Sequence, residues 1–358
     1  MIKILHSADW HLDSPIHGRT EAQTALLRAA LLALPGKIAA VCKAECCDIM
    51  LLAGDLFDGP YTADSYHALR SALEEVAVPV FIAPGNHDFA GPDSPWLKER
   101  WPENVFIFSQ NHMVSVALPN LNCWVCGAGF TAPDSDSLLD GFRAEDPAFF
   151  TIGILHGDPT QTSSPYCPIT EQQVRESGLD YLALGHIHKG GSFRAGKTLC
   201  LWPGCPMGRG FDELGEKGVQ IVTLDKEETS TRFIPLETPR FYDLEADAGD
   251  APAAALNRIL PPVGNEDFYR ITLTGESEPL DLDGLASQFS RFPNLEIRDR
   301  TTPPIDLWAC AGEDTLEGVY FRMLQEAMDG QDEDTCNRIR LAAKISRHLL
   351  DGREVKLP

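Results

Sequence analysis

Five short apolar runs in this chain each lead directly into a polar cluster that contains Asp, Asn or His. The runs are β-branched or leucine-rich and uninterrupted, which is typical of strands buried on both faces of a sheet. Because ligand sites in open α/β sheets lie just beyond the carboxyl ends of strands, such strands can aim their clusters at one point. The runs are Ile2–Ser7, Asp48–Ala53, Val78–Ala83, Thr151–Leu155 and Leu179–Leu184.

Two stretches with helical spacing of apolar residues lie between the first three runs. They are Glu21–Cys46 and Thr62–Val76, so the first part of the chain is expected to fold as β-α-β-α-β. Later apolar runs follow one another without helices and suggest β-hairpins. Together these elements predict a layered α/β (α+β) sandwich with two central β-sheets flanked by helices. The later runs are Val105–Phe108, Met113–Leu118, Cys123–Gly127, Val219–Leu224 and Arg232–Leu236.

The composition changes after about residue 240. Asp243–Pro262 is rich in Ala, Asp and Pro and is expected to be a linker with a short helix. We therefore predict a main domain at 1–240, a small α/β domain at 241–311 and a C-terminal helical segment at 312–358. The elements expected after the linker are strands Phe268–Thr274 and Leu295–Arg300, and helices Leu280–Phe289, Thr315–Met328 and Asp334–Leu350.

The charge of the chain restricts how it can bind nucleic acid. The formal net charge is −23, and the sequence contains no run rich in Lys and Arg. Proteins that track nucleic acid usually present a basic face, because Lys and Arg replace the phosphate counterions. Any DNA binding is therefore expected to use a local basic patch, a metal site or a partner. Divalent cations in an acidic site would mask part of the charge.

The sequence favours a cytoplasmic protein without membrane contact. No apolar run approaches the ~20 residues needed to span a bilayer. The N-terminal stretch Met1–Asp9 becomes polar too soon for a signal peptide. The 10 cysteines, in a chain of 358 residues, do not indicate a disulfide scaffold.

The polar clusters have the residue types of a dinuclear metal site. Asp and Asn supply oxygen ligands and His supplies nitrogen, a mixture that suits Mn, Fe or Zn better than Mg or Ca. In Asp-x-His and His-x-His, residues i and i+2 point to the same side of an extended backbone. Asp55 is placed to bridge two ions. The clusters are Asp9-x-His11, Gly54-Asp55-Leu56-Phe57-Asp58, Gly85-Asn86-His87-Asp88, His156-Gly157-Asp158 and Gly185-His186-Ile187-His188.

Each cluster taken alone has an ordinary explanation. Asp-x-His is usually a turn, Gly-Asn-His-Asp is usually a loop, and His-x-His on a strand more often faces solvent. The complete set, in this order and each after a buried strand, is hard to explain as loops. The metal site is therefore the favoured interpretation.

The ordered set of clusters resembles the signature of the calcineurin-like metallophosphoesterases and spans residues 9 to 188. The resemblance implies two divalent metal ions, with Mn²⁺ favoured and Fe or Zn as alternatives. It implies that His87 is not a ligand but lies near the scissile phosphate. It implies one metal bound by Asp9, His11, Asp55 and His188, and a second bound by Asp55, Asn86, His156 and His186.

Longer motifs look like those of SbcD-type nucleases and the related bacterial YhaO-type proteins. Position 58 is Asp, where archaeal and eukaryotic relatives carry a second catalytic-site His. Asp58 therefore joins His87 as a catalytic candidate, and the difference bears on how phosphate is positioned. The motifs are His6–Leu12, Ala53–Asp58, Trp202–Arg209, Glu213–Gly218 and Glu313–Thr315.

This resemblance implies a metal-dependent DNA exonuclease subunit that acts 3′→5′ in DNA repair. Its expected substrate is DNA, its expected partner is an SbcC-like, SMC-type P-loop ATPase, and a homodimer is also considered. Residues 241–311 would then form a capping domain. The alternative is a phosphodiesterase or phosphatase that acts on a small nucleotide or ester at the same dinuclear site, which fits the acidic composition better. A third hypothesis, a non-enzymatic assembly subunit, is disfavoured because all expected ligands are present.

Two further residues are candidates for substrate contact. Arg209 lies in a glycine-rich turn, where it either touches a phosphate or forms a salt bridge with Glu213. His17 follows the first motif and either faces the cleft or lies in a surface loop.

The two C-terminal helices are expected to carry apolar stripes at helical spacing. The stripes either pack on each other or on the small domain, or they form a docking site for the coiled-coil base of the ATPase. The sequence favours neither interpretation over the other.

Overall fold

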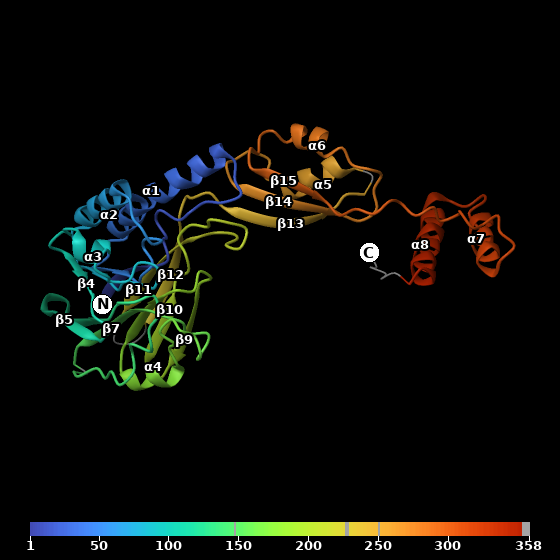
Figure 1. Ribbon diagram of the computed structural model, residues 1–358. Helices are drawn as coiled ribbons and strands as arrows, with labels where there is room; N and C mark the ends of the chain where they lie inside the picture. Colours follow the sequence, from blue (N-terminus) through green and yellow to red (C-terminus); the bar gives the residue numbers. More distant parts are fainter. Residues whose placement is uncertain (147, 226–228, 250, 353–358) are drawn as a thin grey trace. The chain divides into compact units, whose positions relative to one another are not determined.

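The computed structural model describes residues 1–146, 148–225, 229–249 and 251–352. The chain forms two compact units, which are labelled by element in Figure 1. The first comprises Met1–Asp243 with Glu266–Tyr269, and the second comprises Leu244–Asn265 with Arg270–Pro358. The expected three-part division stays a prediction.

The first sheet of the first unit has six strands in the order β12-β11-β1-β2-β3-β4. Strands β1 to β4 are parallel neighbours, and β11 runs antiparallel to β1 and to β12. The strands are β1 (Ile2–Ser7), β2 (Ile49–Leu52), β3 (Val80–Ile82), β4 (Val105–Ile107), β11 (Gly218–Leu224) and β12 (Thr229–Pro235).

The second sheet also has six strands, in the order β5-β6-β7-β8-β10-β9. Its centre is parallel from β6 to β10, and the edge strands β5 and β9 are antiparallel to their neighbours. The strands are β5 (Val114–Leu118), β6 (Cys123–Gly127), β7 (Phe150–His156), β8 (Tyr181–Gly185), β9 (Gly191–Ala195) and β10 (Thr198–Trp202).

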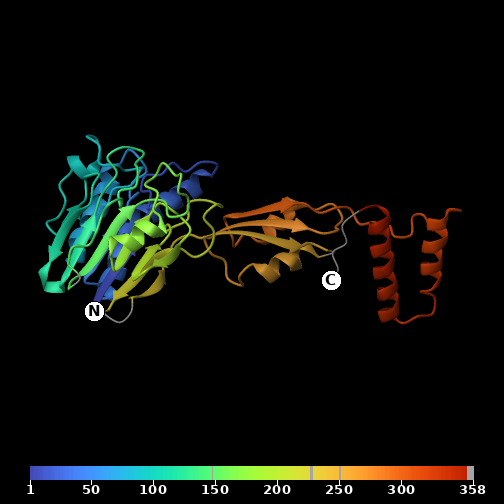
Figure 2. The same ribbon diagram turned by 90° about the horizontal axis from the view of Figure 1, so that it is seen from below.

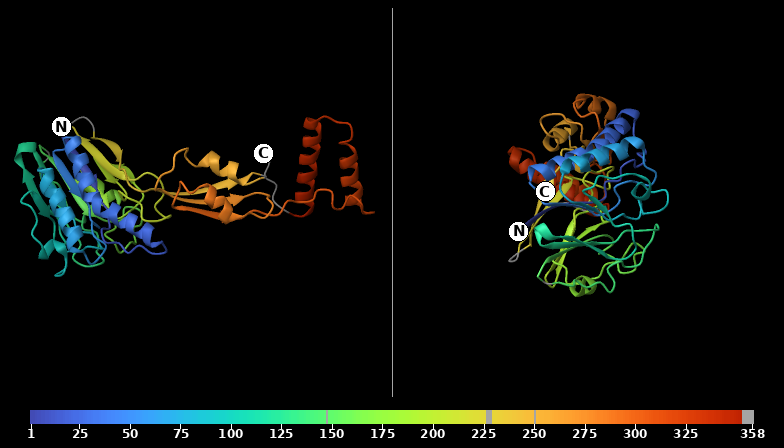
Figure 3. Two further views of the ribbon diagram at one scale, coloured as in Figure 1. Left: turned by 90° about the horizontal axis from the view of Figure 1, so that it is seen from above. Right: turned by 90° about the vertical axis from the view of Figure 1, so that its left-hand side faces the viewer.

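The two sheets pack face to face and form the centre of a four-layer sandwich (Figure 3). Alternation along β1 shows the arrangement, because Ile4 packs in the cluster between the sheets whereas Leu5 packs in the cluster with the helices. Helices α1 (Glu21–Ala44) and α2 (Ala63–Val76) cover the first sheet, and α4 (Glu171–Ser177) covers the second. The layered α/β sandwich predicted from the sequence is confirmed.

Helix α1 is long and apolar enough, by length and composition, to cross a membrane. The sequence-based expectation that no segment reaches this length therefore needs correction. Such a helix is weak evidence for a membrane, because the core helix of a globular domain meets the same criteria. One face of α1 packs on the first sheet through Leu27, Leu31, Leu34 and Ile38.

Within the described residues, the second unit holds four helices and most of a three-stranded sheet in the order β13-β14-β15, whose strands β13 and β14 begin in the first unit. Helix α6 contacts β15, and α7 and α8 lie side by side (Figure 2). The elements are β13 (Phe241–Asp247), α5 (Pro252–Ile259), β14 (Phe268–Thr274), α6 (Leu282–Gln288), β15 (Leu295–Asp299), α7 (Leu316–Glu326) and α8 (Glu333–Leu350).

Three sequence-based expectations about elements were wrong. The segment Asp243–Pro262 was expected to be a linker, but most of β13 lies in it, and only its α5 part matches the expected short helix. The run that became β4 was expected in a hairpin, but it pairs parallel to β3 as an edge strand. Strands β9 and β10 were not anticipated, because Gly191 and the short turn at Gly196 interrupt the apolar pattern. Two short helices also occur, α3 (Pro95–Lys98) and the 3-10 turn Pro119–Leu121.

Candidate metal centre

The polar clusters meet because the carboxyl ends of β1, β2, β3, β7 and β8 lie at one edge of the two packed sheets. Backbone hydrogen bonds join the first two loops, since Asp9 N donates to Gly54 O at 3.0 Å and His11 N donates to Asp55 O at 3.0 Å. The second sheet joins them where His186 N donates to Asp9 Oδ1 at 2.9 Å. Two backbone–backbone hydrogen bonds and one backbone–carboxylate hydrogen bond therefore hold these loops together.

One group of side chains at this edge consists of Asp9, His11 and His188. Each offers one ligand atom, and these atoms lie within 4.8 Å of one another. Two imidazole nitrogens, His11 Nε2 and His188 Nε2, are 3.1 Å apart. Such convergence of ring nitrogens with a carboxylate is the arrangement of a metal ligand set.

A second group consists of Asp55, His156 and His186, whose ligand atoms also lie within 4.8 Å. The amide oxygen of Asn86 lies 3.0 Å from His156 Nε2 and 3.2 Å from His186 Nδ1. Burial lowers the pKa of His186 to about 4, which keeps this imidazole neutral and able to bind a cation through its lone pair.

Asp55 lies between the two groups. Its Oδ2 is 3.3 Å from His156 Nε2 and 3.8 Å from His11 Nε2. Burial opposes ionisation of Asp55, but the neighbouring His156, His11 and His87 hold its pKa well below the usual range. The side chain is thus an anion placed where it can contact two cations.

The residues present fit the pair of metal ions that their chemistry implies. Asp9 Oδ2 is buried and, among the described residues, has no hydrogen-bond partner. Burial also raises the pKa of Asp9, which reflects the cost of removing a carboxylate from water. A cation at this oxygen would remove both penalties. All predicted ligands, Asp9, His11, Asp55, Asn86, His156, His186 and His188, lie in this cluster, and their roles as ligands stay predictions.

Backbone strain is concentrated in the same loops. Asp9, His11, Asp55 and His186 have φ values of 56°, 49°, 50° and 93°, in the left-handed region that non-glycine residues rarely adopt. Strained backbone of this kind, at about 1–3 kcal/mol per residue, typically persists at functional sites. The sequence patterns described above predicted no strained backbone at these positions.

Glu213 orients His188 and is a residue that the sequence did not assign to the site. Glu213 Oε1 accepts a hydrogen bond from His188 Nδ1 at 2.6 Å, which turns Nε2 of that ring toward the cluster. Glu213 is buried and its charge is balanced by Arg209, whose Nη2 donates to Oε1 at 2.8 Å. No local pattern reveals this role, because Glu213 reaches His188 only through the fold.

Asp88 connects two of the loops that carry the ligands. This buried carboxylate accepts hydrogen bonds from the backbone N–H groups of Gly85 at 2.7 Å and Leu56 at 2.8 Å. Burial and the charge of Asp55 raise its pKa to about 7. The sequence placed Asp88 within a motif without assigning it a task, and the structure shows that it holds the Asp55 and Asn86 loops together.

His87 and Asp58 form a pair beside the cluster. His87 Nδ1 and Asp58 Oδ1 are 2.6 Å apart, and the hydrogen bond raises the pKa of His87. The His87 side chain is 47% exposed, whereas His11, whose ring centroid is 4.8 Å away, is buried. His87 therefore faces solvent at the mouth of the site, next to the predicted metal ligands.

The two predicted substrate contacts lie in different surroundings. Arg209 is joined to Glu213, and its Nη1 donates to Ser14 Oγ at 3.2 Å. The salt bridge that was the alternative interpretation of Arg209 is thus present, and phosphate contact stays a prediction. His17 is exposed in the loop before α1 and, within the described part of the chain, forms no hydrogen bond to the cluster.

The chain matches a known protein family and a known relative. The model of the calcineurin-like phosphoesterase family matches residues 2–190. YhaO of Bacillus subtilis (strain 168), described as an uncharacterized metallophosphoesterase, is 30% identical over 250 residues. That match covers 65% of this chain and 60% of the relative, so it spans less than two thirds of the relative's length.

Solved structures of low sequence identity also match. TT1561 of Thermus thermophilus is 14% identical, with a TM-score of 0.41, 65% of this chain covered and 98% of the other. A dimetal phosphatase from Danio rerio is 12% identical, with a TM-score of 0.45, 65% of this chain covered and 95% of the other. At these scores neither adds to the argument about the site. On the match to more than half of its length, this chain belongs to the calcineurin-like phosphoesterase family.

Proposed function

We propose that the chain is a metal-dependent phosphodiesterase that removes nucleotides from DNA ends in the 3′→5′ direction. The observation that carries the proposal is Asp55, which lies between two ligand groups, while the exposed His87 side chain, paired with the mostly buried Asp58, lies beside them. This arrangement supplies charge stabilisation and a proton donor at one place, which hydrolysis of a phosphodiester requires.

In this proposal the residues of the chain divide the work. When bound, two divalent ions supply a nucleophile at neutral pH and neutralise charge on the phosphate. Hydrolysis joins a water oxygen to phosphorus and breaks the bond from phosphorus to the leaving 3′ oxygen. Protonated His87, held by Asp58, donates a proton to that leaving oxygen, and Glu213 keeps His188 in its ligand orientation.

The ions that we propose are Mn²⁺, with Fe and Zn as the alternatives that the same ligand types accept. The mixed set of imidazole nitrogens and carboxylate oxygens supports this choice over Mg²⁺. Reconstitution of the metal-free chain with each ion, followed by metal analysis and a diesterase assay, tests it.

The experiment that tests the proposed function compares three substrates for the purified chain with Mn²⁺. Duplex DNA, single-stranded DNA and bis(4-nitrophenyl) phosphate are incubated in parallel, and products are resolved by length. We expect all three to be cleaved, with mononucleotides released from the 3′ ends of DNA. Cleavage of the small diester without any cleavage of DNA would contradict the DNA proposal.

A small-molecule phosphodiesterase is the second candidate, because the net charge of −23 opposes binding of a polyanion. The DNA exonuclease proposal gives the second unit a role as a capping domain and partner site. The presence of this unit therefore supports DNA as the substrate. The substrate comparison separates the two, since the second candidate predicts turnover of small diesters alone.

We also propose that an SMC-type P-loop ATPase binds the chain and contributes basic surface for DNA in the cytoplasm. The support is an apolar groove of about 580 Å³ on α7 and α8, lined by Leu316, Tyr320, Leu349 and Leu350. The exposed fractions of Leu316 and Leu349 are 90% and 66%, which is unusual for side chains of this size. A homodimer is an additional proposal that sedimentation of the purified chain tests.

A further inference from the structure

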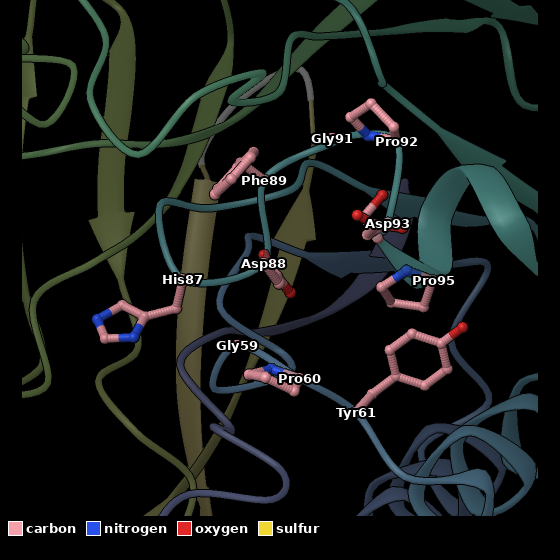
Figure 4. Close-up of a pocket in the computed structure, with 11 residues that line it drawn as sticks. Gly59, Pro60, Tyr61, His87, Asp88, Phe89, Gly91, Pro92, Asp93 and Pro95 are labelled. Carbon is pink, nitrogen blue, oxygen red and sulfur yellow. The ribbon is translucent and has the colours of Figure 1, made fainter.

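A pocket of about 420 Å³ opens beside the metal cluster, next to His87. Two loops form it, residues 59–61 after β2 and residues 87–95 after β3. Figure 4 shows Tyr61, Pro60 and Pro95 gathered on one side, with the His87 imidazole on the other. We call this cavity the side pocket, and its volume lies within the range of small-ligand sites, about 300–1,000 Å³.

The lining of the side pocket is mainly apolar and aromatic. The ring of Tyr61 and three prolines face it, and the hydroxyl of Tyr61 is occupied by a hydrogen bond to Glu99 Oε1 at 2.7 Å. Two carboxylates in the lining are already paired. Asp88 accepts backbone N–H groups, and Asp93 Oδ1 is 2.5 Å from Lys98 Nζ. Such a surface favours a flat, uncharged ring over a phosphate or a carboxylate.

The walls of the side pocket are firmly attached to the site. Asp88 ties the loop after β3 to the loop after β2 through the N–H groups described above. Trp96 supports the outer wall, because its Nε1 donates to Asp88 O at 2.5 Å and its ring packs 5.6 Å from that of Phe57. The pocket therefore keeps a fixed position relative to Asp55 and Asn86, which lie on the same two loops.

We infer that the side pocket binds the heterocyclic base of the nucleoside that carries the leaving oxygen. His87 lines the side pocket and also lies beside the metal cluster. A nucleoside whose 3′ oxygen leaves next to His87 would therefore have its base at the opening of the side pocket. The inference rests on the proposed function, because it assumes that His87 protonates the leaving oxygen. It adds the recognition of a base to a site that otherwise contacts only phosphate.

A matched pair of substrates tests the inference. One is a thymidine dinucleotide, and the other is the same dinucleotide with an abasic residue on the leaving side. For the unchanged chain with Mn²⁺ we expect kcat/KM to be about tenfold higher with the base, within the span of one base–aromatic contact. Tyr61→Ala should bring this ratio close to one. Tyr61→Leu, which keeps apolar bulk and protects folding, should lower it in the same direction.

The control is Phe233→Ala, which removes a half-exposed ring from β12 in the other part of the first sheet and should keep the unchanged chain's ratio. If the unchanged chain cleaves both dinucleotides equally well, the inference is wrong and the proposed function stands. If neither is cleaved, the proposed function is wrong.

A binding experiment tests the side pocket independently of catalysis. The metal-free chain is titrated with thymidine, and binding is followed by tryptophan fluorescence. Binding that Tyr61→Leu weakens supports a base site, and no binding overturns it.

Discussion

Asp55 is the residue on which both halves of the metal cluster depend, because one of its oxygens lies near both ligand groups. We expect Asp55→Asn to lose both ions and the diesterase activity, since asparagine keeps the shape but not the charge that holds two cations together. Metal analysis of the purified variant measures this directly. Asp48→Asn, at the opposite end of β2, is the matched control. Two fully occupied ions with near-normal turnover in Asp55→Asn would refute the bridging role.

The prediction for His87 differs from that for Asp55, because the His87 side chain is exposed and paired with Asp58 rather than buried among the predicted ligands. His87→Gln should keep two ions and lower kcat by ~10²–10⁴, the span expected for a lost proton-transfer group. Metal content and rate are measured on the same preparation. If metal content and kcat fell together, His87 would be a metal ligand. His11, Asp58 and His87 do form a third group of side chains that could hold an ion.

Glu213 acts on the metal site through His188. Glu213→Gln keeps the size of the side chain but removes the anion that accepts from His188 Nδ1 and balances Arg209. We expect metal affinity to fall by ~10–100-fold, as for other partners of ligating histidines. Titration of the metal-free chain with Mn²⁺ gives the affinity. Glu216→Gln, an exposed residue on the same loop, should show no such fall, and equal affinities in the two variants would rule out this role.

At the scale of elements, the site requires the end of β8 to pass very close to the end of β2. A Cβ atom on Gly185 would lie 1.9 Å from Ala53 O and 2.9 Å from His156 Nδ1. We therefore expect Gly185→Ala to push the two sheets apart at this edge, at a cost of ~1–3 kcal/mol in the free energy of unfolding. Chemical denaturation and metal analysis should both register the change.

The same substitution elsewhere supplies the control for Gly185. Gly36 lies inside α1, and a Cβ atom there would meet nothing within 4 Å. Gly36→Ala should leave metal content unchanged and raise stability by up to ~1 kcal/mol, because alanine has the higher helix propensity. If Gly185→Ala were as stable as Gly36→Ala, the close approach of β8 and β2 would not matter for the site.

At the scale of the whole molecule, the C-terminal helix pair carries a small core and a separate exposed face. Phe321 and Ala343 are fully buried in that core, whereas Leu316 and Leu349 are exposed. We expect the double variant Leu316→Asp, Leu349→Asp to unfold at the same temperature as the unchanged chain and to hydrolyse bis(4-nitrophenyl) phosphate normally. It should no longer co-purify with the proposed ATPase, because two charges would enter the apolar contact.

The matched control is Leu97→Asp, which places a charge on an exposed leucine of the first unit, outside the C-terminal helices. Co-purification that survives the double variant would show that docking lies elsewhere. Loss of folding in the double variant would show that the exposed face is structural. Truncation near Glu313 provides a coarser version of the same test.

Much of the architecture was accessible from the sequence because it depends on local periodicity. Uninterrupted apolar runs identified β1, β2, β3, β7 and β8, and helical spacing identified α1 and α2, in each case within a few residues of the observed bounds. These patterns report burial, and burial on both faces is what a central parallel strand requires. Edge strands carry a weaker pattern, so the parallel pairing of β4 and the existence of β9 and β13 were not predicted. Strand β10, which lies between β8 and β9, was missed as well.

The order of motifs along the chain was enough to predict which residues gather, since each cluster follows a buried strand and parallel strands end at the same edge. How they gather depends on the packing of the folded chain. That packing places Asp55 between two ligand groups and brings Glu213 to His188, whose ring it orients by a hydrogen bond. It also lets Asp88 join two of the loops that carry the predicted ligands. These contacts link positions far apart in the chain, as with His188 and Glu213, which are 25 positions apart. Local pattern cannot encode such distances, because they are fixed by the way the two sheets pack together.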